Sequence, residues 1–333
     1  MIASRLLHVL NGDATVHGLR RSDATGTLAV WADILHEGPV PGEGTAPERW
    51  RDVRARYIAA AGYASYEDAL HLYAEWDHAL EGYPDFDEVV LWFEHDLFDQ
   101  LILVRHLDWF ARRDLGGTQL CLICIGHYPG VEPFHGLGQL SPDQLASLVG
   151  TRQRVTPLQT ELARAAWRAF TGPDPTKLER LLEGDTSALP FLAGALRRLL
   201  QEFPSVENGL PRTERHILES VATGVLSPAD LFDAVQRQEE RVFMGDGVFW
   251  RRVEQLAAGP HPLLALDLRG REPHRLPDGL VRSTVQGRDV LAGTTDWVRR
   301  SGIDRWLGGV HLSGREVPWR WDERAGRLRP QGA

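Results

Sequence analysis

The sequence predicts an α/β protein with a Rossmann-like N-terminal domain built on a mainly parallel sheet, a helical bridge and a winged-helix-like C-terminal domain. The first observation is that short apolar runs alternate with helical apolar spacing along the first 150 residues. The second is that the pattern changes to three helices and two strands after a linker rich in proline and glycine at 204–211. We therefore place the domains at 1–150, 151–205 and 206–333.

The predicted strands of the first domain are apolar along their length, as is typical of parallel strands covered by helices on both faces. The third strand has the sequence VVLWF, rich in β-branched and aromatic residues. Helices follow from apolar residues three or four apart, and Ser65 with Asp68 predicts the start of one of them. The strands are expected at 6–10, 28–31, 89–93 and 120–125, and the main helices at 50–61, 65–80 and 97–111.

Polar residues concentrate between the third strand and the helix that follows it. Glu94, His95 and Asp96 come directly after the strand, and Asp99 with Gln100 would occupy the first helical turn. Capping of the helix and a solvated turn would explain part of this cluster. The carboxyl ends of parallel strands are, however, where ligands bind in open α/β sheets. We therefore predict Glu94, His95 and Asp96 as catalytic residues, and Asp99 and Gln100 as ligand-binding residues.

The other predicted strands also end in polar residues that could reach the same edge of the sheet. A single acid after a strand is usually a turn or cap, but the repetition at four strand ends favours a shared site. Hard cations prefer several carboxylates, and an imidazole can act as a general base near neutral pH. The expected ligand-binding residues here are Asn11, Gly12 and Asp13, the expected divalent-metal ligands are Asp13, Asp33 and Asp96, and His127 is a further catalytic candidate.

A glycine-rich loop precedes a helix that Ser141 and Gln144 should cap as a capping box. A helix N-terminus can receive phosphate or carboxylate, which makes His135, Gly136 and Gly138 candidate ligand-binding residues. The loop matches neither the dinucleotide fingerprint nor the phosphate-binding loop, since the third glycine and the lysine are missing. A structural turn is therefore the favoured interpretation of this loop.

Composition narrows the class of protein. Hydrophobic residues make up 43% and charged residues 25% of the chain, as in an ordinary soluble protein. Two cysteines and no apolar run of membrane length argue against a secreted disulfide scaffold and a membrane partner, and no signal peptide is recognised, so the expected location is cytoplasmic. Cys121 and Cys124 have metal-ligand spacing but face opposite sides of a strand, so we predict core thiols.

Charge and helix pattern bear on nucleic-acid binding. Residues 1–150 carry 10 arginines against 22 acidic residues, a net charge of −12, so this domain should not follow a phosphate backbone. In the last domain the third helix would offer Arg251 and Arg252 to a major groove, but a scaffold or protein-contact role is favoured over DNA binding. Four tail tryptophans could stack bases, yet packing is again favoured; they are Trp297, Trp306, Trp319 and Trp321.

Five stretches spread over nearly the whole chain carry a family resemblance. They read HVLNGDAT, DILHEGPVP, LWFEHDLFDQL, ICIGHYPGVEPFHGLGQLSPDQLASL and GIDRWLGGVHL. These stretches resemble a bacterial family known as domain of unknown function number 1835, with its associated C-terminal region. The resemblance implies the domain boundaries given above and brings no activity. A related branch of that family carries Trp-x-Gly and a downstream Glu-Gln where this chain has Trp92-Phe93-Glu94 and Asp99-Gln100. This difference implies that the acid before Gln100 is a more persistent feature than Glu94, His95 and Asp96.

Two function hypotheses follow. The first, weakly favoured, is an enzyme acting on a nucleotide-like or phosphorylated small molecule, a hydrolase or transferase that uses the acidic and histidine cluster with or without a divalent metal ion. The alternative is a transcription-associated regulator, in which a ligand-sensing α/β domain is coupled to a winged-helix output that binds DNA or protein. A small-molecule ligand is expected in both, and the sequence leaves the oligomeric state open.

Overall fold

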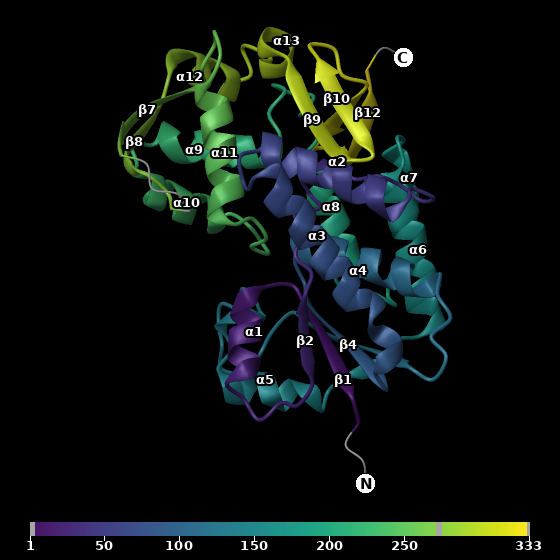
Figure 1. Cartoon of the computed structure of the whole chain (residues 1–333). Helices are drawn as coiled ribbons and strands as arrows, with labels where there is room; N and C mark the ends of the chain where they lie inside the picture. Colours follow the sequence, from purple (N-terminus) through teal and green to yellow (C-terminus); the bar gives the residue numbers. More distant parts are fainter. Residues whose placement is uncertain (1–3, 271–274, 332–333) are drawn as a thin grey trace. The chain divides into compact units, whose positions relative to one another are not determined.

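The computed structural model describes residues 4–270 and 275–331, which fall into two compact units (Figure 1). Unit 1 comprises Met1–Leu196 and Gly308–Val310, and unit 2 comprises Arg197–Leu307 and His311–Ala333. Within the described ranges, no helix combines the length and the apolar character that crossing a membrane would require.

The stretch expected to form a separate helical bridge is divided between the two units. Helices α6 (Pro157–Thr171) and α7 (Thr176–Leu182) belong to unit 1, and the boundary falls within α8 (Leu192–Leu200). The reason is that α6 packs against α4 (Leu97–Ala111), and its alanine, tryptophan and phenylalanine side chains are buried. The apolar face that predicts this helix therefore serves the core of the first domain.

A five-stranded sheet forms the centre of unit 1, with the strand order β2-β1-β4-β5-β6. Four strands are parallel, and β6 pairs antiparallel with β5. The mixed α/β class, the mainly parallel sheet and all four predicted strands are confirmed. The strands are β1 (Leu6–Leu10), β2 (Thr27–Val30), β4 (Glu88–Glu94), β5 (Gln119–Ile125) and β6 (Gln153–Arg154); a two-residue strand, β3 (Gly38–Pro39), lies outside this sheet.

The strand order creates a switch point between β1 and β4. The chain passes from β1 to β2 on one side and later enters β4 on the other side of β1. In register, Leu10 of β1 lies beside Val30 of β2 and beside Trp92 of β4. The crevice outside the carboxyl ends of two such strands is the usual ligand-binding place in open α/β sheets. Residues just after Leu10 and at the end of β4 therefore lie in the favoured position.

Helices cover both faces of the sheet. On one face α1 (Asp13–Arg20) and α5 (Pro142–Val149) contact each other over a core that includes Val90 and Trp92 (Figure 1). Because side chains alternate along a strand, Phe93 points to the other face, where its ring centroid is 5.6 Å from that of His106 in α4. The predicted capping box at Ser141 is present. The remaining long helices of unit 1 are α2 (Pro47–Ala60) and α3 (Tyr66–Glu81).

Unit 2 contains the three predicted helices and the predicted antiparallel hairpin, followed by more structure than the sequence pattern indicates. After β10 the chain forms a further antiparallel pair, β11 and β12, and Trp297 and Trp321 are buried, as packing tryptophans should be. The elements are α9 (Arg212–Ala222), α10 (Pro228–Gln236), α11 (Asp246–Ala257), β7 (Leu264–Arg269), β8 (Asp278–Ser283), α12 (Val285–Leu291), α13 (Trp297–Ser301), β9 (Ile303–Gly308), β10 (Val310–Gly314), β11 (Trp319–Asp322) and β12 (Arg327–Pro330).

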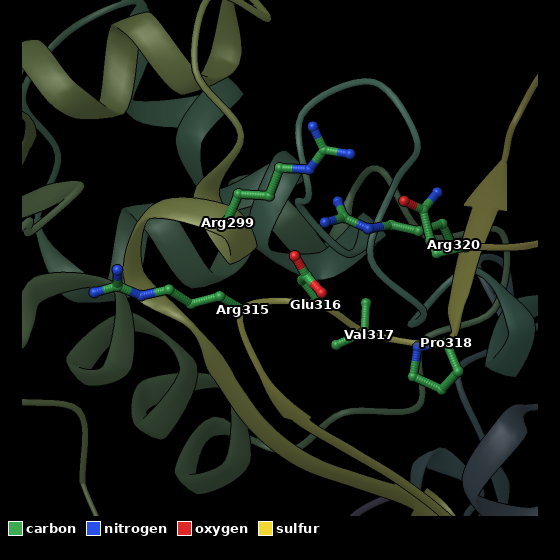
Figure 2. Close-up of a pocket in the computed structure, with 7 residues that line it drawn as sticks. Arg299, Arg315, Glu316, Val317, Pro318 and Arg320 are labelled. Carbon is green, nitrogen blue, oxygen red and sulfur yellow. The ribbon is translucent and has the colours of Figure 1, made fainter.

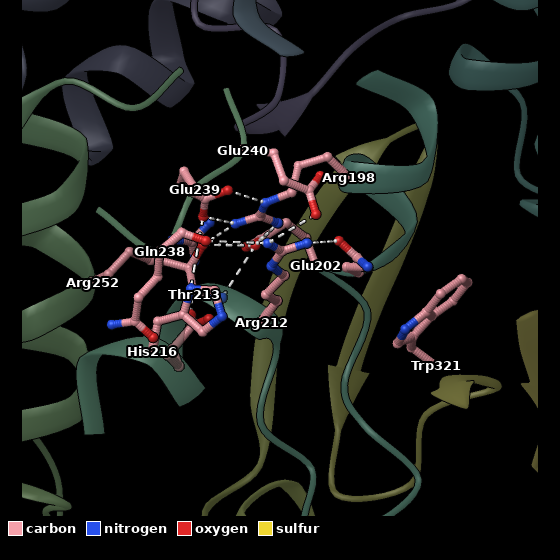
Figure 3. A network of polar contacts seen from close by, with 12 residues as sticks. Arg198, Glu202, Arg212, Thr213, His216, Gln238, Glu239, Glu240, Arg252 and Trp321 are labelled. Atoms are coloured by element: carbon pink, nitrogen blue, oxygen red, sulfur yellow. Dashed lines mark hydrogen bonds and ion pairs between the residues drawn. The ribbon is translucent and has the colours of Figure 1, made fainter. Parts of the chain in front are cut away.

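The core of unit 2 holds a network of buried ion pairs (Figure 3). The guanidinium group of Arg198 donates to Glu202 at 2.6 Å and to Glu239 at 2.7 Å. Burial alone would raise the pKa of Glu202, but Arg198, Arg252 and Arg305 outweigh it and lower that pKa to about 2. In this network the positive charges of buried arginines therefore compensate the negative charges of buried glutamates inside the unit.

Arg252 belongs to this network. Its side chain is buried, and its Nη1 atom lies 3.6 Å from a carboxyl oxygen of Glu214. Helical periodicity explains the burial, because Arg252 shares one face of α11 with the buried residues Val248 and Leu256, four positions away on either side. The expectation that the third helix offers Arg252 to a major groove is therefore wrong, because this side chain is buried and pairs with Glu214 inside the unit.

Candidate functional site

Three buried carboxyl groups gather where β4 leads into α4. Glu94 ends β4, Asp96 is the N-cap of α4, and Asp99 lies in its first turn. The side chain of Asp96 accepts a hydrogen bond from the backbone N–H of Asp99 at 3.1 Å, so the capping role weighed from the sequence is present. Asp99 turns back toward the strand, and its Oδ1 accepts from the backbone N–H of Glu94 at 2.8 Å. The cap and the strand end thus hold the carboxyl groups together.

Asn11 joins the cluster from the neighbouring strand. It follows β1 directly, and its amide nitrogen is 2.9 and 2.7 Å from the two carboxyl oxygens of Asp99. The same nitrogen is 3.4 Å from Oε1 of Glu94. An amide NH2 group offers two hydrogens, which matches two acceptor carboxyl groups. Asn11, predicted as a ligand-binding residue, therefore links the ends of β1 and β4 at the switch point.

The glycine-rich loop before α5 supplies a backbone donor to the same cluster. The N–H group of Leu137 donates to Oε1 of Glu94 at 2.5 Å. Gly136 has a φ of 150°, and a Cβ atom at this position would overlap the Glu94 carboxyl group. Both the backbone conformation and the space require glycine there. The loop is therefore a structural turn that brings an N–H group to a buried acid.

We expect Gly136→Ala to lower the free energy of unfolding by about 1–3 kcal/mol, because it combines a strained backbone with a clash against a buried carboxyl group. Urea unfolding would measure the loss. Gly12→Ala is the matched control, since Gly12 flanks the same cluster but has an extended backbone and open space around the position of its Cβ. Equal stability of the two variants would contradict the close approach of Gly136 to Glu94.

Burial dominates the electrostatics of the cluster. It raises the pKa of Glu94 to about 8, and the nearby carboxyl group of Asp96 adds to this effect, whereas the N–H groups of Leu137 and Asn11 oppose it. Burial, followed by repulsion from Glu94 and Asp96, also raises the pKa of Asp99 well above its ordinary value. Near neutral pH the Glu94 carboxyl group therefore favours the protonated form, in which it can donate a hydrogen bond.

The same geometry suits a cation. One oxygen from each of Glu94, Asp96 and Asp99 can be chosen so that all lie within 4.8 Å of one another. No other group of three histidine, cysteine or acidic side chains meets this spacing in the part of the chain that the structure describes. A donor set made only of carboxyl oxygens favours Mg²⁺, Mn²⁺ or Ca²⁺. Of the predicted metal ligands only Asp96 is in this group.

Gln100 and His95 lie beside the carboxyl groups. The side-chain amide of Gln100 donates to the backbone carbonyl of Glu94 at 2.5 Å and contacts the sulfur of Cys124 at 3.4 Å. Burial raises the pKa of the Cys124 thiol to about 12, as fits a core thiol. The ring of His95 stacks on that of Phe134, with centroids 5.9 Å apart. Gln100 thus positions the end of β4, and His95 is the imidazole next to the cluster along the chain.

Asp33 is engaged elsewhere in unit 1. Its two carboxyl oxygens accept from Nε and Nη2 of Arg54 at 2.8 and 2.7 Å, and one of them also accepts from the hydroxyl of Tyr73 at 2.7 Å. All three side chains are buried. Asp33 therefore forms a structural ion pair in place of the predicted metal site, because a buried guanidinium group satisfies both of its oxygens.

The remaining predicted residues stay outside the three-carboxyl group. Asp13 is exposed at the first position of α1, where an acid favours the helix dipole. His127 and His135 are exposed as well, and the backbone N–H of His135 donates to the side chain of Gln139 at 2.6 Å. Gly12 is the N-cap of α1, and Gly138 is exposed in a short 3-10 helix. The ends of adjacent parallel strands lie close together, but residues a few positions after a strand, such as Asp13 and His127, can lie away from this edge.

Sequence reasoning did not predict the roles of two groups in the cluster, a metal ligand and a backbone hydrogen-bond donor. Asp99 was expected to bind a ligand, and the structure adds it to the candidate metal group. The donor N–H of Leu137 has no side-chain signal, and only the glycine before it hints at a close approach. The spacing Glu-x-Asp-x-x-Asp across a strand end and a helix cap is the local pattern that could have indicated three converging carboxyl groups.

No protein-family model matches this chain, and no curated protein matches it significantly. The resemblance of its five stretches to domain of unknown function number 1835 stays a prediction.

Proposed function

We propose that unit 1 is an enzyme that acts on a phosphorylated or nucleotide-like small molecule with the help of a divalent cation held by Glu94, Asp96 and Asp99. The observation that carries the proposal is the gathering of three buried carboxyl groups within 4.8 Å at the β1/β4 switch point. Buried acids are usually paired with a cationic group. The neighbours that shift the pKa of Glu94 and Asp99 are other carboxyl groups and neutral N–H donors. A bound cation would supply the compensating charge.

The chemistry follows from the roles that these residues can take. A divalent cation held by carboxylates polarises phosphoryl oxygens and orients the substrate. Asn11 and the N–H of Leu137 hold two of the carboxyl groups in place, so the site is formed before the ligand arrives. We assign the general base to His95, because an imidazole nitrogen can accept a proton and this residue lies between two of the acids along the chain. The reaction class is hydrolysis or group transfer at phosphorus.

We also propose the finer fold assignments, a Rossmann-like arrangement for unit 1 and a winged-helix-like arrangement for α9, α10, α11 and the β7–β8 hairpin. Support for the first is the parallel strand order with ligand-type residues at the switch point. Support for the second is the sequence of three helices and a hairpin. Because Arg252 is buried beside Glu214, we favour a scaffold role for unit 2 over DNA binding.

Thermal unfolding of the full chain tests the cation. We expect Mg²⁺, Mn²⁺ or Ca²⁺ at a saturating millimolar concentration to raise Tm by roughly 5–10 °C relative to EDTA, because the cation binds only the folded protein. Asp96→Asn should reduce this shift strongly, since asparagine preserves the helix cap but removes a charged ligand. A cation-dependent release of phosphate from nucleotides should be lost in the same variant.

Asp13→Asn is the matched control. It removes an acid that follows β1 and was predicted to bind metal, yet Asp13 is exposed and outside the three-carboxyl group. The Tm shift should survive in this variant. Melting temperatures that are the same in EDTA and in all three cations would remove the metal from the proposal, and equal losses in both variants would place the cation elsewhere.

A further inference from the structure

Unit 2 contains a pocket of about 780 Å³ with an excess of positive charge (Figure 2). Its lining holds three guanidinium groups and one carboxylate, and Asp296, which pairs with Arg320 at 2.7 Å, brings the local balance of formal charges to +1 in a chain whose net charge is −9. The lining residues are Arg299, Arg315, Glu316, Val317, Pro318, Arg320 and Gln331.

Arg320 forms a fixed part of this lining. Arg320 is 2% exposed, and its Nη1 atom donates to the carboxylate of Asp296 at 2.7 Å and to the backbone carbonyl of Ser205 at 3.1 Å. A Cβ atom on Gly209 would come within 3.1 Å of the same guanidinium group, so the packing holds the side chain in place. Its Nε atom is buried and has no hydrogen-bond partner among the described residues.

Arg299 of α13 and Arg315, between β10 and β11, add positive charge to the lining. Both are exposed, and neither forms an ion pair within the described ranges. Figure 2 shows the guanidinium groups of Arg299 and Arg320 turned toward the same part of the pocket, with the carboxylate of Glu316 beside them. The side chain of Arg315 extends away from this part of the pocket, so Arg299 and Arg320 are the two guanidinium groups that share it.

We propose that this pocket binds a small molecule that bears a phosphate group. A guanidinium group presents paired N–H donors that match two phosphate oxygens. The volume lies within the range of small-molecule sites. Val317 and Pro318 offer an apolar wall for the rest of the ligand. This site belongs to unit 2 and uses none of the acidic residues of the proposed catalytic cluster.

Isothermal titration calorimetry of the full chain with inorganic phosphate, pyrophosphate and a nucleoside monophosphate tests the proposal. EDTA and low ionic strength keep divalent cations out and limit screening. We expect binding of all three, strongest for the nucleotide, and a loss of about tenfold in affinity for Arg299→Gln and for Arg315→Gln. Arg300→Gln is the matched control, because Arg300 is exposed on the same helix but is not in the lining.

The three arginine variants change exposed positions, so they should keep the wild-type Tm. Asp96 is not in the lining of the pocket, so Asp96→Asn should bind phosphate as the wild type does. No heat of binding for any of the three anions would overturn the proposal. An equal loss of affinity in Arg300→Gln would also overturn the proposal, because it would show that any exposed arginine on this surface attracts the anions. Binding confined to single-stranded oligonucleotides and growing with their length would replace the pocket with a nucleic-acid track.

Discussion

Replacing Arg54 with methionine is expected to lower the free energy of unfolding by about 3–5 kcal/mol, because it leaves the buried carboxylate of Asp33 without its cation. Arg54 is fully buried and uses all five of its N–H donors. Beyond its two bonds to Asp33, it donates to the backbone carbonyls of Glu37 at 2.7 Å, Pro39 at 3.0 Å and Ile34 at 3.2 Å. Urea unfolding would measure the loss.

Arg54→Lys should be destabilising as well, although it keeps the charge, because an ammonium group cannot reproduce a planar fork of five donors. Arg56→Met is the matched control on the same helix. Arg56 is exposed, and its ion pair with Asp52 at 2.8 Å is solvent-screened, so we expect a change below about 1 kcal/mol. Losses of similar size in the Arg54 and Arg56 variants would show that the buried ion pair does not hold this part of unit 1 together.

Replacing Glu94 with glutamine is expected to stabilise the metal-free protein at pH 8 and to abolish stabilisation by divalent cations. The folded-state pKa of Glu94, about 8, lies above its ordinary value of 4.5, so the folded protein holds this proton more tightly than the unfolded chain does. The contribution of Glu94 to stability therefore falls as the pH rises from about 4.5 through about 8. Glutamine stays neutral and can still accept the hydrogen bond from Leu137.

The measurement is urea unfolding of wild type and Glu94→Gln in EDTA at pH 5 and pH 8. The variant should gain on the order of a few kcal/mol relative to wild type between these two pH values. With Mg²⁺ or Mn²⁺ at pH 8 the order should reverse, because the cation takes the place of the proton in wild type and finds one ligand fewer in the variant. A stability difference that does not change with pH would show that the Glu94 carboxyl group is not buried among other acids.

Local patterns in the sequence were enough to define most elements. Apolar runs predicted the four parallel strands, periodic spacing predicted α2, α3 and α4, and Ser141 with Gln144 predicted the start of α5. The sequence placed Glu94 and Asp96 at a strand end and Asp99 in the first turn of the next helix, and the structure brings one oxygen of each within 4.8 Å of the others. These features depend on neighbours a few positions away, which is why spacing and residue type are sufficient to indicate them.

Only the tertiary structure decided which charged groups meet. Asn11 donates a hydrogen bond to Asp99, which is 88 residues away in the sequence. Arg54, in α2, donates to Asp33, which lies in the segment before that helix. Arg252 likewise lies on the buried face of α11, beside an acid from α9. A buried charge is stabilised by whichever partner the packing places within reach, and that partner depends on long-range contacts. Residue type and spacing along the chain predict whether a charged residue lies at a strand end or in a helix. The fold determines whether that residue is placed to bind a ligand or to form an ion pair in the core.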